Sequence, residues 1–188
     1  MIRTIKRGRS AALVITALTI TAACIVLTMS ACSKKNEGAG SDNKGDDMSP
    51  SDIVEAISKD VELPAYEIIP LDKTNFESFA FAPYDDEYHA VAADALVNIT
   101  AHSVVVIKTD KGDGQDLAET IAINADPNKW LCVGSEIVNV AYTDDCVLLV
   151  MSEKATADAL VNNFKTLAQE FENSEVNLLT AGNMRYEQ

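Results

Sequence analysis

The feature that most constrains the fold is a pattern of two strands followed by a helix, which occurs twice in the second half of the chain. Each copy holds two runs rich in β-branched residues, followed by apolar residues at helical spacing. The strands are predicted at residues 95–100, 103–109, 137–142 and 146–151, and the helices at about 115–125 and 157–171. Because each pair of strands is joined by only a few residues, the pattern predicts antiparallel hairpins.

The two copies align at a spacing of 43 residues, which pairs Val104 with Val147 and Leu117 with Leu160. A true duplication is one interpretation of this alignment. The other is that any two strand-then-helix segments align in this way. Both interpretations stay open at this point, and the expected architecture is the same for both.

The expected fold is of the α+β class: a four-stranded, largely antiparallel sheet from two ββα units, with both helices on one face and an additional N-terminal helix. The N-terminal helix should begin at Ser49, because Ser49 is a good cap, Pro50 suits the first helical position, and Asp52 lies in the first turn. Between the prolines of residues 64–83, the sequence predicts only a short strand at 66–69 and a short helix at 74–79.

The first residues of the chain have the order of an export signal. Residues 3–9 hold four basic side chains and no acid, and residues 11–29 carry no charge. These nineteen uncharged residues also come close to the roughly 20 that span a bilayer, so an uncleaved anchor helix is the alternative. Both interpretations place the rest of the protein outside the cytoplasm.

Met29, Ser30, Ala31 and Cys32 resemble a bacterial lipobox, in which lipoprotein signal peptidase cuts before a cysteine that already carries diacylglycerol. Met29 stands where leucine is usual, and it is apolar and of similar volume. Cys24 is a poorer candidate, because the apolar residues 25–27 follow it. The resemblance implies lipidation of Cys32 and attachment to the extracytoplasmic face of the cell membrane, where two acyl chains hold stably.

The predicted organisation has four parts. They are a lipoprotein signal peptide at 1–31, a polar tether at 32–48, an α+β domain at 49–175 and a C-terminal tail at 176–188. The tether contains no aromatic or branched aliphatic residue and is expected to be flexible. Its Lys34 and Lys35 are expected to lie against the membrane surface.

The remainder of the chain is strongly acidic. Without residues 1–31, the chain keeps 11 of its 15 basic residues and all 29 acidic ones, a formal charge of −18 over 157 residues. Such a body repels phosphate, so nucleic acid is not an expected partner. The acids are expected to form an ordinary solvated surface.

Two further cysteines, Cys132 and Cys146, follow the lipobox cysteine at a distance. Both lie beside apolar residues, where a free and buried cysteine behaves as a small hydrophobic residue. In an exported protein a disulfide between them is the alternative. Both interpretations stay open.

Candidate sites for metal binding and catalysis are weak. Asp85, Asp86 and His89 offer ligand types that suit Ca²⁺, Mg²⁺ or Zn²⁺, but adjacent acids on a loop are usually only solvated. The glycine-containing loop at 110–116 lacks the ligand register of a calcium loop, and Asp113 is expected to cap the helix that follows. His102 is expected to be an exposed turn residue. The sequence predicts no catalytic residue, cofactor or metal.

The lipobox, the acidic body and the stretches VVVIKTDKG and NKWLCVGSEIVNVAYTDDCVLLVMS resemble a family of small lipoproteins from Gram-positive, mostly anaerobic bacteria that carries a domain of unknown function. The similarity covers about residues 51–171. It implies the fold and the location, and it transfers no activity. The expected function is therefore binding or scaffolding at the cell envelope, with a protein or cell-wall partner. A cell-envelope hydrolase that acts through Asp85 and Asp86 or another pocket, or a small-ligand sensor subunit, is the alternative.

Overall fold

The computed structural model describes residues 48–97, 99–171 and 174–181, and all of these belong to the second of the two units into which the chain divides, Ser41–Gln188. The elements are, in chain order, α1 (Pro50–Ser58), β1 (Tyr66–Leu71), α2 (Phe76–Ala80), β2 (Tyr88–Ala95), β3 (Ser103–Thr109), α3 (Gly114–Asn124), β4 (Ile137–Tyr142), β5 (Cys146–Ser152), α4 (Lys154–Phe171) and β6 (Asn177–Thr180). The α+β class is as expected.

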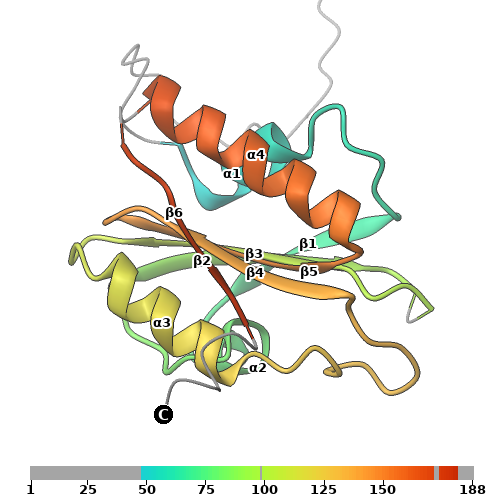
Figure 1. The fold of residues 1–188 in the computed structure, drawn as a ribbon. Coiled ribbons are helices and arrows are strands. Elements are labelled where there is room, and N and C mark those ends of the chain that lie inside the picture. The colour runs from blue at the N-terminus through green and yellow to red at the C-terminus, as the bar shows by residue number, and fades with distance from the viewer. Residues whose placement is uncertain (1–47, 98, 172–173, 182–188) are drawn as a thin grey trace, which may run out of the picture. The chain divides into compact units, whose positions relative to one another are not determined.

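The strands form one antiparallel sheet in the order β1-β2-β3-β5-β4-β6 (Figure 1). The expectation of four strands was wrong in number, because an edge strand is added on each side. The short strand expected at 66–69 joins the sheet as β1, beside β2. Part of the expected C-terminal tail is β6, which pairs with β4 and closes the other edge.

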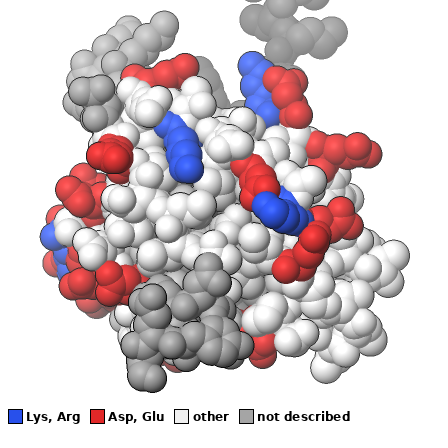
Figure 2. Space-filling view, viewed as in Figure 1, with Lys and Arg blue, Asp and Glu red and all other residues white. Residues whose placement is uncertain are grey.

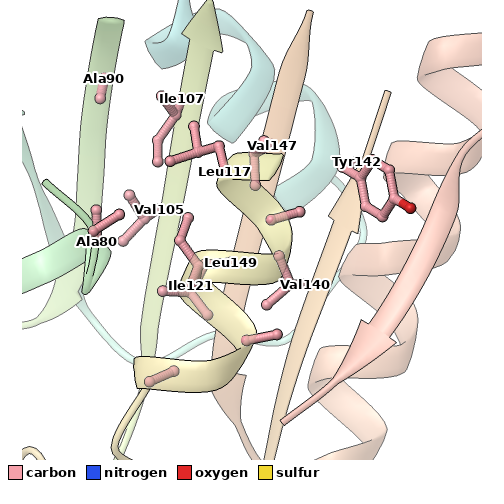
Figure 3. Packing of buried hydrophobic residues seen from close by; sticks show 14 of the residues in the cluster. Ala80, Ala90, Val105, Ile107, Leu117, Ile121, Val140, Tyr142, Val147 and Leu149 are labelled. Atoms are coloured by element: carbon pink, nitrogen blue, oxygen red, sulfur yellow. The ribbon is translucent and has the colours of Figure 1, made fainter. Parts of the chain in front are cut away.

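The expectation that both long helices cover one face was also wrong. In Figure 1, α1 and α4 lie on one face of the sheet and α2 and α3 on the other. Leu117 and Ile121 of α3 point toward Val105 and Leu149 (Figure 3), whereas Leu160 of α4 belongs to the separate core on the opposite face. The reason is that residues 104–107 of β3 and 146–151 of β5 are unbroken apolar runs, so both of their faces must be covered.

The placement of the helices bears on the 43-residue recurrence. Val104 faces the core under α1 and α4, and its aligned partner Val147 faces the core under α3. A two-fold rotation that exchanges the antiparallel strands β3 and β5 would place aligned residues on the same face of the sheet. The odd spacing of 43 residues places them on opposite faces instead. Leu117 and Leu160 differ in the same way. The two ββα units therefore share a sequence pattern without being related by a two-fold rotation of the sheet.

The first hairpin is shifted relative to the prediction. The strand before β3 is β2, Tyr88–Ala95, and not residues 95–100, of which all but Ala95 lie in the connection between the two strands. Four of the eight residues of β2 are alanine, which has little strand preference, so the local signal is weak. Pairing with β1 on one side and with β3 on the other holds the strand in the sheet.

The start of α1 is confirmed. The Ser49 hydroxyl accepts a hydrogen bond from the backbone N–H of Asp52 at 3.3 Å, and the Asp52 carboxylate accepts one from the Ser49 N–H at 3.1 Å. This capping box fixes the point at which the chain enters the domain. Ile53, Val54 and Ile57 are the buried residues of the helix.

Asp113 does not cap α3 with its side chain. Its carboxylate instead accepts hydrogen bonds from the Thr109 hydroxyl at 2.5 Å and the Tyr88 hydroxyl at 2.9 Å, which joins the ends of β2 and β3. Burial, together with this hydrogen bond, raises the pKa of Tyr88 to about 12. The first residue of α3, Gly114, packs directly against the turn between β4 and β5, where its N–H donates to the Asp144 carbonyl at 2.9 Å.

Gly114 supplies a test of this packing. A Cβ atom at this position would collide with the backbone carbonyl oxygens of Thr143 and Asp144. We expect Gly114→Ala to lower the free energy of unfolding by about 1–3 kcal/mol, as measured by urea denaturation. Gly112→Asn is the matched control, because Gly112 has a φ of +67° that asparagine tolerates and the nearest atom is 4.0 Å from its Cβ position. Equal stability of Gly114→Ala and the wild type would contradict the close approach.

Candidate functional site

Four connections meet at one end of the sheet, which we call the loop end. They are residues 59–65 between α1 and β1, 96–102 between β2 and β3, 125–136 between α3 and β4, and Glu153 before α4. The strand register brings them together, because Asp94 pairs with Ser103, Ser103 with Met151, and Ser152 with Ile137. The loop end lies on the right in Figure 1.

A groove of about 660 Å³ opens at the loop end between residues 60–64 and the first turns of α4. The remaining lining residues are Thr100, Ser152, Glu153, Ala155, Thr156 and Ala159. Asp60, Glu62 and Glu153 are exposed, and no lysine or arginine is among the lining residues. Asp60 has a φ of 61°, a left-handed conformation that aspartate tolerates better than most residues, and it turns the chain beyond α1 into the groove wall.

A buried histidine lies beside this groove. The His102 side chain is 0% exposed, and its Nδ1 lies 3.0 Å from the hydroxyl oxygen of Ser152, which lines the groove. Within the described residues, His102 Nε2 is buried without a hydrogen-bond partner. The expectation of an exposed turn residue was wrong, because the connection spans 96–102 and His102 sits at its buried end, where β3 begins.

Burial lowers the pKa of His102, and the positive charge of Lys129 adds to this effect, while the negative charge of Asp94 opposes it. The imidazole is therefore neutral at physiological pH. A hydroxyl group beside an imidazole is also the contact that activates a serine nucleophile, but such a pair needs a third group that orients the imidazole. Within the described residues, the second nitrogen of His102 has none.

A second polar cluster occupies the opposite face of the sheet at the same end. Lys129 Nζ lies 3.1 Å from an Asp94 carboxylate oxygen and 2.8 Å from the Ser103 hydroxyl. It also lies over the rings of Phe79, at 5.2 Å, and Trp130, at 4.8 Å. Burial lowers the pKa of Lys129, and Asp94 counteracts this shift. These contacts tie the 125–136 connection to the hairpin.

The connections that frame the loop end carry exposed apolar side chains, which we call the apolar tip. Leu96 is 57% exposed, Val97 51%, Ile99 82% and Leu131 103%. A pocket of about 260 Å³ lies between the two connections and is lined from both sides, by residues 99–101 and by Val133 and Gly134 among others. Because Thr100 and Glu153 line this pocket as well as the groove, the groove, the pocket and the tip form one continuous surface.

The residues that the sequence suggested as metal ligands lie elsewhere, at the other end of β2. Asp85 pairs with Lys111, and the hydrogen bond from Lys111 is the main cause that lowers the pKa of Asp85. Asp86 and His89 are exposed. Within the part of the chain that the structure describes, no three His, Cys, Asp or Glu side chains are arranged to hold a metal ion.

The two downstream cysteines differ in environment. Cys132 is exposed in the connection after α3, contrary to the expectation of burial, whereas Cys146 is buried at the start of β5. The structure forms no disulfide between them. Trp130 is half-buried and packs against the core under α3.

The predicted lipidation site lies outside the described residues. This applies to Cys32, to the preceding Met29, Ser30 and Ala31, and to the competing Cys24. Among the residues that are described, no helix has the length and apolarity needed to span a membrane.

His102 supplies a test of the burial at the loop end. Because its pKa is lowered in the folded state, the unfolded chain binds more protons below about pH 6.5, and stability falls as the pH drops through that value. We expect the free energy of unfolding to lose up to about 1.4 kcal/mol per pH unit below pH 6.5, measured by urea denaturation at several pH values. This slope should be smaller in His102→Asn.

The control is His89→Gln, which removes the chain's other histidine, an exposed one. It should keep the wild-type slope. A slope lost in His89→Gln and kept in His102→Asn would contradict the assignment.

Comparisons with protein-family models, with curated proteins and with solved structures find no match for this chain. The candidate function therefore rests on the geometry of the loop end and on the features of the sequence.

Proposed function

We propose that this protein is a lipid-anchored lipoprotein of the cell membrane, with its domain on the extracytoplasmic face, and that the domain binds an envelope protein through the loop end. The apolar tip carries the proposal. Its four side chains are each more than half exposed and belong to neither core, and exposed apolar surface of this kind marks interaction sites. The sequence supports the location through the lipobox-like residues before Cys32 and the resemblance to small Gram-positive lipoproteins.

The direction in which the chain enters the domain agrees with this function. The backbone carbonyl of Met48 accepts a hydrogen bond from Lys108 Nζ at 3.2 Å, and Lys108 lies near the end of β3 that is opposite the loop end. The chain that leads back to Cys32 thus leaves from the end of the sheet remote from the tip. Residues 33–47 span at most about 50 Å when extended, which sets the greatest distance between Cys32 and Met48.

The charge of the domain favours a protein partner over a lipid surface. Acidic side chains are scattered over the face shown in Figure 2 and exceed the basic ones, which agrees with a formal charge of −14 for the whole chain. Anionic headgroups repel such a surface. In the same view, the lower right, where Figure 1 places the connection after α3, is uncharged surface.

Lipidation can be tested through the two N-terminal cysteines. We expect cells that express the protein to incorporate an alkyne-labelled palmitate into the wild type and into Cys24→Ala, and not into Cys32→Ala. The Cys32→Ala chain should also keep residues 1–31, which mass spectrometry detects. Normal labelling and cleavage of Cys32→Ala would show that Cys32 is not the modified residue.

Binding through the tip can be tested by photo-crosslinking in intact cells. A benzoylphenylalanine residue at Ile99 or Leu131 should give the same discrete crosslinked product from both positions. The matched control places this residue at Asp110, which is exposed beyond the other end of β3. If Ile99 and Leu131 give no product beyond that of Asp110, the tip is not a binding surface.

A further inference from the structure

We infer that the groove at the loop end binds an extended segment of the partner protein that carries basic and apolar side chains. This inference rests on the proposed function and identifies the chemistry of the partner. It is carried by the charge of the groove, by its apolar floor and by its continuity with the apolar tip.

The charge is one-sided. Asp60 and Glu62 stand on one wall, and Glu153 stands at the start of α4 on the other. All three are exposed, and no basic side chain lines the groove. The nearest lysine along the chain on the α4 side, Lys154, is paired with Asp158 at 2.5 Å. Three carboxylates without a counter-charge in the lining are complementary to lysine or arginine.

The floor of the groove is apolar. Val61, Leu63 and Pro64 are half-buried, and the first two pack against the core under α1 and α4. Ala155 and Ala159 present small side chains on the α4 side, which leaves the groove open. Apolar side chains of a bound segment can therefore lie on this floor while its basic side chains reach the acidic rim.

The continuity with the tip favours a polypeptide over a small cation. Thr100 and Glu153 line both the groove and the neighbouring pocket, and Ile99 extends the surface to the tip. A ligand that contacts the groove, the pocket and the apolar tip must be long and must expose apolar side chains at intervals. Ser152, which is itself buried, lines the groove beneath this surface and contacts the buried His102.

The test uses the full-length protein in detergent and fluorescence anisotropy with labelled eight-residue peptides. The probe alternates leucine with lysine, and the comparison peptides alternate leucine with glutamate or with serine. We expect binding of the lysine peptide alone. The triple variant Asp60→Asn, Glu62→Gln, Glu153→Gln should weaken it by about tenfold. Asp60→Asn keeps a side chain that tolerates the left-handed conformation.

The matched control removes the same number of charges elsewhere, in Glu77→Gln, Asp86→Asn, Asp110→Asn, all exposed and outside the groove. It should weaken binding less than about twofold. Equal losses in the two triple variants would overturn the inference, because the general charge of the domain would then explain the binding. Ala159→Trp, which fills the groove without changing its charge, should also abolish binding, and unchanged affinity would overturn the groove as the site.

Two further outcomes decide between ligand classes. If lysine amide displaces the labelled peptide as effectively as unlabelled peptide does, the ligand is a small cation and the inference is overturned. Binding to phosphatidylglycerol vesicles that the groove variant loses would also overturn it. Crosslinks from Ile99 and Leu131 that persist while the peptide fails to bind would overturn only the peptide chemistry. Absence of crosslinks from Ile99 and Leu131 beyond those of the Asp110 control would overturn the proposed function.

Discussion

The pairing of β3 with β5 at the centre of the sheet is the constraint on which the rest of the structure depends. Every residue of β5 is buried, and six of the seven residues of β3 are buried too. A strand pair of this kind has no face that water can cover, so the domain needs two layers of helices. The other strands pair outward from β3 and β5, and the two polar clusters at the loop end lie on opposite faces beside them.

The same pair explains which parts of the fold could be predicted. Its two strands and the helices that follow them were recognisable, because long β-branched runs and helical spacing are strong local signals. The face of the sheet on which each helix packs was not recognisable, because it depends on the face toward which the connection after each strand turns. The alanine-rich β2 was displaced for a related reason: its pairing partners hold it, and its own residues signal a strand only weakly.

The candidate site was largely beyond prediction. His102 and Ser152 are 50 residues apart and meet only because β3 begins beside the end of β5. The groove combines residues from the start of the domain with residues near its end, and no local sequence pattern predicts such a surface. One signal was available in the sequence: Leu96, Val97 and Ile99 are apolar residues in a segment that also had to turn. They were assigned to a strand, whereas they form the exposed tip.

The opposite positions of the chain entry and the apolar tip have a mechanical consequence. When the domain is held at Met48 and pulled at the tip, the force first loads α1, which precedes the first strand in the chain and packs on the sheet without joining it. The packing of α1 through Ile53, Val54 and Ile57 therefore bears the load before any hydrogen bond of the sheet does. The sheet itself stays paired for as long as this helix holds its place.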